Sequence, residues 1–226
     1  YLCMRLAAAI KLPVPPVHLI QVPETVYIVQ RYDRIVSGDI VKCLHQVDGC
    51  QLLGLGQDWK YERQGLVSLK RIVEALRGLQ LPAKDLLSFQ RWVMFNYLIG
   101  NSDAHAKNIS VLIDETGYAL APFYDLLCVQ VYGDDRLALY IGDEDQYASI
   151  GAHSWEAFCE DCGFSVKSTM TLFRKMAQDV AKAWATVTAQ ATVDFALSRP
   201  ELGLIQSITM VIETNCSAAL SMTTKR

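Results

Sequence analysis

Residues 100–108 read GNSDAHAKN, a polar loop between two apolar segments. In the segment before it, residues 85–99, large apolar side chains recur at helical spacing, which predicts a helix in the interior of the protein. The segment after it, residues 109–113, is rich in β-branched and other apolar residues, which predicts a strand. A polar loop placed between a buried helix and a strand indicates a functional site as well as a turn.

Two acids and an amide in and after this loop are the residue types that phosphoryl transfer uses. Asp103 and Asn108 are five positions apart, and Asp125 follows the next predicted hairpin. Protein kinases orient the attacking hydroxyl with an Asp and hold Mg²⁺ against the phosphates with an Asn and a later Asp. In this arrangement Asp103 accepts the hydroxyl proton, Lys107 stabilises the transferring phosphoryl group and His105 braces the loop. Asn108 and Asp125 are then the predicted magnesium ligands.

Taken one at a time, these polar residues are explained by turn formation or helix capping, because their side chains bond to nearby backbone. Their order along the chain, first the loop, then a hairpin and a third acid, favours phosphoryl transfer. Small-molecule phosphotransferases use the same trio, so it does not by itself identify the substrate.

Two linked motifs carry a resemblance to a known family. Residues 101–108, NSDAHAKN, resemble the N-S/T-D-x-H-x-K-N catalytic loop of HipA-type kinases, and residues 121–127, APFYDLL, resemble that family's metal-binding segment L-A/S-P-x-Y-D-L/V-L. Upstream, residues 30–34, QRYDR, are similar to its E-R-F/Y-D-R hinge. Residues 45–55, HQVDGCQLLGL, are similar to its H-Q-E-D-x-C-Q-x-L-G stretch. In motif order the resemblance runs over residues 1–164.

The resemblance implies an α+β, protein-kinase-like fold of the HipA type, with residues 1–226 as one C-terminal kinase domain. The helical lobe dominates this fold, beside a short β-segment at the hinge and a metal-binding hairpin. The resemblance also implies ATP and Mg²⁺ as cofactors, with Asp103 and Lys107 as catalytic residues and Asn108 and Asp125 as metal ligands. The cofactor-binding residues that it implies are Gln30, Arg31, Tyr32, His105, Asn108, Tyr124 and Asp125.

Two departures from the family pattern concern the hinge and the motif that follows it. Gln30 stands where the family has glutamate, and Val47 stands where it has an acidic residue. The resemblance implies that the backbone of Gln30 and Tyr32 faces adenine. The change at Gln30 therefore matters only if the family's carboxylate braces a neighbouring group.

The part of such a kinase that grips the ATP phosphates is not found in this sequence. HipA-like kinases have a phosphate-binding loop and a strand lysine before a segment like residues 1–6, and neither is present. Gly54 and Gly56 do not form a phosphate loop, because Trp59 stands where the third glycine is required. The chain also starts at tyrosine. We therefore expect a fragment or incomplete lobe whose own phosphoryl transfer is slow or undetectable.

Composition favours a globular protein of the cytoplasm. Hydrophobic residues make up 51% of the chain and the net charge is −3 with mixed signs, so we expect neither direct nucleic-acid binding nor a membrane. The seven cysteines are scattered, which favours reduced thiols. Cys159 and Cys162 have no second pair to complete a zinc site and are expected to be thiols at a helix end.

The remaining elements follow from apolar periodicity. Residues 17–22 and 26–29 are expected to pair as a hairpin, and residues 118–120 are expected to return after a turn at 114–117. Helices are predicted over residues 2–10, 66–79, 85–99, 153–162, 166–193 and 204–220.

Three functions are consistent with these observations. The first is an ATP-dependent kinase that resembles the toxin of a bacterial toxin–antitoxin module and acts on a serine or threonine of a translation-related protein, with an antitoxin as a further partner. The second is a non-catalytic lobe or binding module that pairs with a missing N-terminal lobe or with an antitoxin. The third is a small-molecule phosphotransferase, which ranks lower because the motifs resemble those of a protein kinase.

Overall fold

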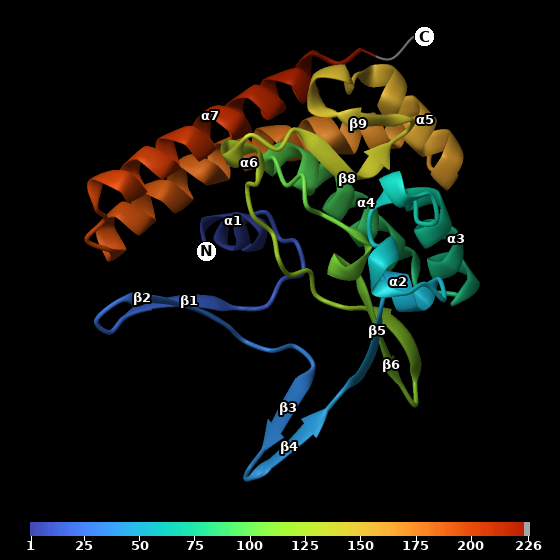
Figure 1. Ribbon diagram of the computed structural model, residues 1–226, viewed down its shortest axis with the longest axis horizontal. Helices are drawn as coiled ribbons and strands as arrows, with labels where there is room; N and C mark the ends of the chain where they lie inside the picture. Colours follow the sequence, from blue (N-terminus) through green and yellow to red (C-terminus); the bar gives the residue numbers. More distant parts are fainter. Residues whose placement is uncertain (224–226) are drawn as a thin grey trace.

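The helices gather in one body, from which the first hairpins extend, whereas the last hairpin, residues 136–146, lies against the helices (Figure 1). The computed structural model describes residues 1–223. Its helices are α1 (Leu2–Ala9), α2 (Gly49–Leu52), α3 (Leu69–Gly78), α4 (Ala83–Ile99), α5 (Ala152–Cys162), α6 (Val166–Asp194) and α7 (Arg199–Ser221). Its strands are β1 (Val17–Gln21), β2 (Thr25–Val29), β3 (Arg34–Ser37), β4 (Ile40–Cys43), β5 (His45–Asp48), β6 (Ser110–Asp114), β7 (Gly117–Leu120), β8 (Arg136–Ile141) and β9 (Glu144–Gln146).

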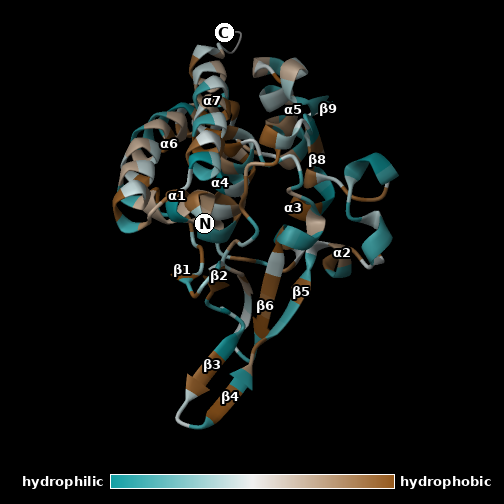
Figure 2. Ribbon diagram, turned by 60° about the vertical axis from the view of Figure 1, so that its left-hand side comes forward, coloured by the Kyte–Doolittle hydropathy of each residue, from teal (hydrophilic) through white to brown (hydrophobic). Residues whose placement is uncertain are grey.

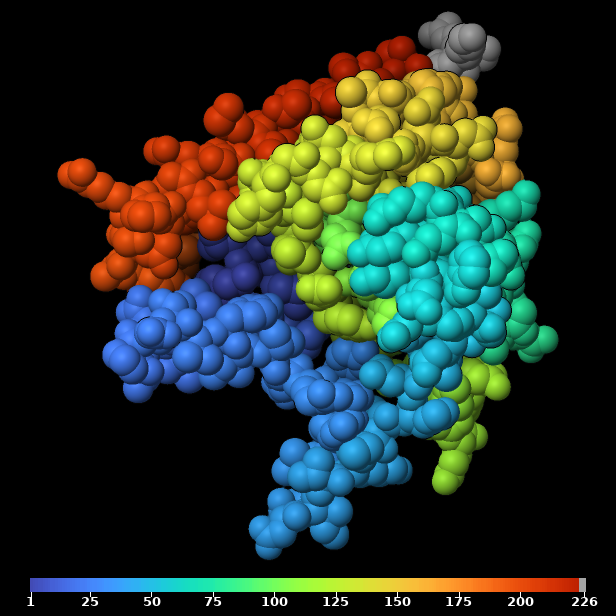
Figure 3. Space-filling view, in the orientation of Figure 1, coloured from blue at the N-terminus to red at the C-terminus, as the bar shows by residue number. Residues whose placement is uncertain are grey.

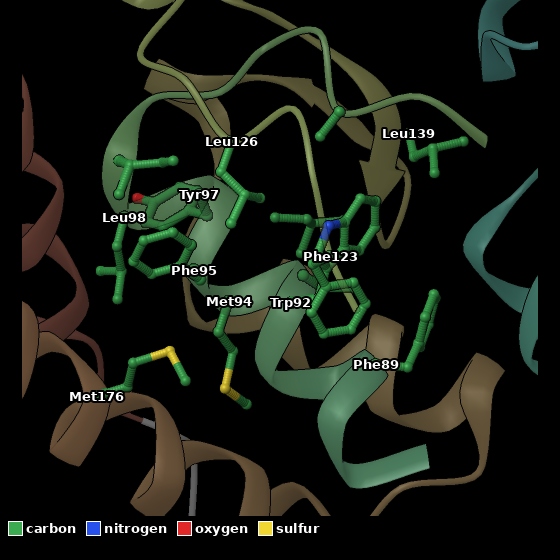
Figure 4. Close-up of a cluster of buried hydrophobic side chains, with 14 of the residues drawn as sticks. Phe89, Trp92, Met94, Phe95, Tyr97, Leu98, Phe123, Leu126, Leu139 and Met176 are labelled. Carbon is green, nitrogen blue, oxygen red and sulfur yellow. The ribbon is translucent and has the colours of Figure 1, made fainter. Parts of the chain in front are cut away.

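Helix α4 lies at the centre of the helical body. Large side chains are buried all around it, because α6, α7 and β7 pack against it. Figure 4 shows Phe89 and Trp92 of this helix beside Phe123. The ring centroids of Phe89 and Trp92 are 5.8 Å apart, and those of Trp92 and Phe123 are 6.0 Å apart. The prediction of a buried helix before the polar loop is confirmed.

Gly100 ends α4 and turns the chain into the polar loop. Its φ of +71° is a left-handed conformation that favours glycine. A Cβ at this position would lie 2.6 Å from Val211 Cγ1 and 2.9 Å from Gln130 Oε1. A larger residue would therefore strain the backbone and press against α7, so α7 helps to determine where the loop starts.

The polar loop leads into an antiparallel three-stranded sheet in the order β5-β6-β7. Asp48, the last residue of β5, pairs with Ser110, the first residue of β6. Strand β7 pairs with β6 and continues into residues 121–127. The sheet thereby brings together the end of β5, the polar loop and the second motif, which are distant in the sequence.

The hairpins β1–β2 and β3–β4 extend from the helical body (Figure 3) and carry apolar residues (Figure 2). Exposed apolar side chains on them are Ile20, Val26, Tyr27, Ile28, Val29, Ile35, Val36, Ile40 and Val41. The hairpin of residues 17–29 was predicted and is confirmed. The β3–β4 hairpin was not predicted, because strands of four residues are too short to show a clear alternation.

The predicted helices are present, and the main difference is at the start of α7. This helix begins at Arg199 instead of residue 204, because Ser198 and Glu201 form a capping box. Ser198 N donates to Glu201 Oε2 at 2.7 Å. No helix among residues 1–223 has both the length and the hydropathy that crossing a membrane requires.

Cys159 and Cys162 lie at the end of α5, as predicted, and both are buried with free thiols. Burial raises the pKa of Cys162 to about 12. The thiol therefore stays protonated near neutral pH and packs as a small apolar group.

Candidate active site

The polar loop is held by backbone hydrogen bonds to α4 and β8. Asn101 N donates to Asn96 O at 2.9 Å, and Ala138 N donates to Ser102 O at 2.8 Å. A short 3-10 turn, η3 (Ala106–Asn108), closes the loop before β6. The side chains of the loop are therefore attached to a well-supported backbone.

Asn108 and Asp125 lie next to each other, although they are on different motifs. Asn108 Nδ2 donates to Asp125 Oδ2 at 2.8 Å. Asp125 has a φ of +57°, which is uncommon for a residue other than glycine, and Asn101 Nδ2 donates to its backbone oxygen at 3.2 Å. The structure thus brings together the two residues predicted to bind magnesium.

The residue types of this pair suit a magnesium ion, and in the structure the amide nitrogen of Asn108 faces Asp125. Asn108 Oδ1 is buried and has no hydrogen-bond partner among the described residues. Leaving such an oxygen unpaired costs about 1–3 kcal/mol, and a metal ion bound there would offset that cost. Amide and carboxylate oxygens are ligands that Mg²⁺ prefers, and phosphates and waters supply its other ligands in kinases.

Asp103 is held by a residue that the sequence did not indicate. The hydroxyl group of Tyr61 donates to Asp103 Oδ1 at 2.9 Å. Tyr61 precedes the short 3-10 turn η2 (Glu62–Gln64) and is 42 positions from Asp103. No local pattern could reveal this contact, because it depends on how two distant loops pack.

The ammonium group of Lys107 bonds to Asp48, with Lys107 Nζ 3.0 Å from Asp48 Oδ2. This hydrogen bond and the charge of Asp48 raise the pKa of Lys107. The Lys107 side chain is 37% exposed, and its contact with Asp48 restricts the position of the ammonium group. Its contact with a phosphoryl group stays a prediction.

His105 packs inside the loop region. Its ring meets the ring of Tyr61 edge to face, with centroids 5.5 Å apart. Burial and the nearby Lys60 ammonium lower the pKa of His105, so the ring is mainly neutral at neutral pH. A neutral packed ring suits the bracing role expected from the sequence, and its contact with the cofactor stays a prediction.

A cleft of about 570 Å³ lies beside Asp125. Gln30, Arg31, Tyr32, Tyr124 and Asp125 are among the residues that line it, whereas the predicted residues on the polar loop lie outside the lining. The rings of Tyr32 and Tyr124 are stacked, with centroids 5.9 Å apart. The cleft thus combines aromatic surface suited to a flat ring with a carboxylate at one side.

Side-chain hydrogen bonds hold the hinge, residues 30–34, beside the cleft. Arg31 donates to the carboxylate of Asp33 through two hydrogen bonds of 2.8 and 2.6 Å, and these contacts lower the pKa of Asp33. Tyr32 donates from its hydroxyl group to Gln46 Oε1 at 2.7 Å. Asp33 thus engages the guanidinium group of Arg31, and the cofactor contact of Arg31 stays a prediction.

Glu62, next to Tyr61, carries a pH dependence that can be measured. Its Oε2 accepts from Tyr140 N at 2.7 Å, and burial raises the pKa of Glu62 from 4.5 to about 7, with Asp161 and Asp143 also raising it. The Glu62 carboxyl group therefore binds its proton more tightly in the folded than in the unfolded protein. The stability that this protonation contributes is complete below pH 4.5 and is lost as the pH rises to about 7.

Glu62→Gln is expected to remove that pH dependence, because Gln keeps the acceptor for Tyr140 N and has no charge. The free energy of unfolding of the wild type should fall by on the order of 2 kcal/mol relative to the variant between about pH 4.5 and 7. Urea denaturation of both proteins across this range measures the difference. Parallel pH profiles would contradict the expectation.

Residues 1–184 match the family described as the HipA-like C-terminal domain. One relative is Y4mE of Sinorhizobium fredii, named as a candidate kinase, which is 36% identical over 189 residues. Another is the serine/threonine-protein kinase toxin HipA of Shewanella oneidensis, which is 31% identical over 204 residues. The alignments cover 81% and 83% of this chain but 45% and 47% of the relatives. The chain spans about half the length of these curated relatives.

Solved structures show the same relationship. HipA of Shewanella oneidensis MR-1, solved with HipB and operator DNA, superposes with a TM-score of 0.89 at 27% identity, over 96% of this chain and 54% of that one. The Helicobacter pylori proinflammatory kinase CtkA superposes with a TM-score of 0.59 at 12% identity, over 98% of this chain and 84% of that one, which shows a likeness of fold. The predicted kinase-like α+β fold is confirmed, and metal binding by the hairpin stays a prediction.

Proposed function

The chain belongs to the HipA-like C-terminal domain family, and from this premise we propose that it serves ATP- and Mg²⁺-dependent phosphoryl transfer to a serine or threonine of a protein. The relatives named as kinases are about twice as long as the part that this chain matches. We propose that a further segment must supply the contacts to the ATP phosphates, and that this chain alone is incomplete for transfer.

The pair of Asn108 and Asp125 beside the cleft is the observation that most supports this function. The stacked rings of Tyr32 and Tyr124 offer a surface for adenine, and Asp125 lies in the same lining. Asn108 Oδ1 is a buried oxygen with no partner among residues 1–223. Nucleotide bound in the cleft would therefore bring its phosphates toward two oxygen ligands suited to Mg²⁺.

The proposed chemistry assigns each polar residue one task. Asp103 orients the hydroxyl group of the substrate and accepts its proton as the bond to phosphorus forms. Lys107 stabilises negative charge on the transferring phosphoryl group. Asn108 and Asp125 would hold Mg²⁺, which when bound neutralises charge on the phosphates.

Nucleotide binding tests the cleft without requiring turnover. Calorimetric titration of this chain with a non-hydrolysable ATP analogue is expected to show binding with Mg²⁺ and at least about tenfold weaker binding with EDTA. The matching GTP analogue is the control, because the hinge is expected to recognise adenine. Absence of binding with Mg²⁺ would contradict a retained kinase cleft in this chain.

A non-catalytic lobe is the second candidate, and the exposed hairpins favour it. Val36 and Ile40 of the β3–β4 hairpin are 70% and 72% exposed. Hairpins of two strands are only marginally stable in water, so these apolar side chains suit contact with a further β-rich segment or a partner protein. An antitoxin is one such partner by analogy with the complex of HipA and HipB. We place these contacts in the cytoplasm and propose no direct contact of this chain with nucleic acid.

A further inference from the structure

The segment from β5 to η2 packs directly on the polar loop. Gly49 N donates to Ile109 O at 2.9 Å, and Ala106 N donates to Lys60 O at 3.1 Å. A Cβ at position 49 would lie 2.5 Å from Ala106 O, so no side chain fits between the two segments. Residues 48–61 therefore bond through backbone to the loop at Ala106 and to Ile109 directly after it, and this packing makes them able to set the positions of the loop side chains.

Asp48 is a rigid anchor at one end of this segment. As N-cap of α2, its Oδ1 accepts from Gln51 N at 2.9 Å, while Asp48 N donates to Gln51 Oε1 at 2.9 Å. This capping box fixes the carboxylate, and its second oxygen accepts from Lys107 Nζ at 3.0 Å. A long lysine side chain is thereby limited to few of its rotamers.

Tyr61 is a rigid anchor at the other end. Its ring lies under the charges of Lys60 and Arg63, which are 4.8 and 4.0 Å from the ring centroid, and it meets the ring of His105. Its hydroxyl group donates to Asp103 Oδ1 at 2.9 Å. These three groups restrict the ring, so the hydrogen bond from its hydroxyl group orients the carboxylate of Asp103.

We propose that Asp48 and Tyr61 are positioning residues for phosphoryl transfer, Asp48 acting through Lys107 and Tyr61 acting through Asp103. This inference rests on the proposed function. It also gives a physical role to residues 45–55, whose motif resembles the family without an evident task. Transfer depends steeply on the placement of reacting groups, so one rigid segment that orients two of them affects rate more than binding.

Two isosteric variants remove only the proposed contacts. Asn is as good an N-cap as Asp, so Asp48→Asn keeps the start of α2 while the charge facing Lys107 is lost. Tyr61→Phe keeps the ring and its packing while the donor to Asp103 is lost. Asp161→Asn and Tyr132→Phe are matched controls, since Asp161 lies on the surface and Tyr132 is 73% exposed.

Phosphoryl transfer is to be measured in the longest natural reading frame that contains this chain. We expect kcat to fall about tenfold in each variant, with the KM for ATP within about twofold of the wild type, because only orientation is lost. In a Lys107→Met background, Asp48→Asn should cause no further loss, since the two residues act as one unit. Unchanged or higher kcat in both variants, or additive losses in the double variant, would overturn the proposal.

Hydrogen exchange of the polar-loop amides separates this inference from the proposed function, because it requires no turnover. We expect the amides of Ala106 and Asn108 to exchange several-fold faster in both variants and at wild-type rates in both controls. If the wild type transfers no phosphate while the exchange rates change as expected, the proposed function fails and the positioning contacts stand. Wild-type exchange in both variants would overturn the positioning role whatever the activity.

Discussion

Replacement of Asp125 by Asn is expected to weaken Mg²⁺-dependent binding of an ATP analogue to this chain by about 100-fold, because it removes the one charged ligand proposed for the metal. Asn tolerates the left-handed backbone at this position, where φ is +57°. Its side-chain oxygen can still accept from Asn108 Nδ2. The change therefore isolates the charge, and calorimetric titration with and without Mg²⁺ measures its effect.

Two controls accompany this measurement. Asp125→Gly adopts the same backbone freely but carries no side chain, so it should lose binding to at least the same extent. Asp161→Asn removes a surface carboxylate and should leave binding unchanged. Binding by Asp125→Asn within about threefold of the wild type would refute Asp125 as a metal ligand.

Asp103→Asn is expected to lower the rate of phosphoryl transfer by about 100-fold to 10,000-fold while nucleotide binding stays within about threefold. The amide can still accept the hydrogen bond from Tyr61 but is a poor acceptor for the proton of the substrate. Single-turnover transfer of labelled phosphate, in the longest natural reading frame, measures the rate. The same preparations are to be titrated with an ATP analogue.

Thermal unfolding of Asp103→Asn shows whether a lost transfer rate comes from the missing proton acceptor or from a damaged fold. Equal thermal unfolding of Asp103→Asn and the wild type, together with a lost rate, supports proton acceptance by Asp103. A variant that retains the wild-type rate would exclude Asp103 from that task. Loss of both binding and rate would instead place Asp103 among the groups that hold the nucleotide.

Much of the helical lobe could be predicted from local patterns. Helix α4 is recognisable because its own sequence carries large apolar residues at helical spacing. Helix α6 is recognisable because its apolar residues keep a helical period over 29 residues. The β3–β4 hairpin was missed, because its strands are four residues long and stay exposed, so burial left no alternating pattern in them.

The site was predictable where its residues share a motif. Asp103 and Asn108 stand on one loop, and Asp125 on the next segment, so the sequence could indicate all three. It could not show that five of the predicted residues line one cleft while the polar loop lies outside that lining. Side-chain directions also stayed unknown, and Lys107 turns out to bond to Asp48.

By itself, the sequence determined the order of helices, the polar loop between α4 and β6, and the residue types available for phosphoryl transfer, since each depends on neighbours along the chain. Only the tertiary structure decided which groups hold these residues in place. Tyr61 is 42 positions from Asp103, and Asp48 is 59 positions from Lys107. Such contacts form because the sheet and the loop pack together in three dimensions, and no spacing within one segment encodes them.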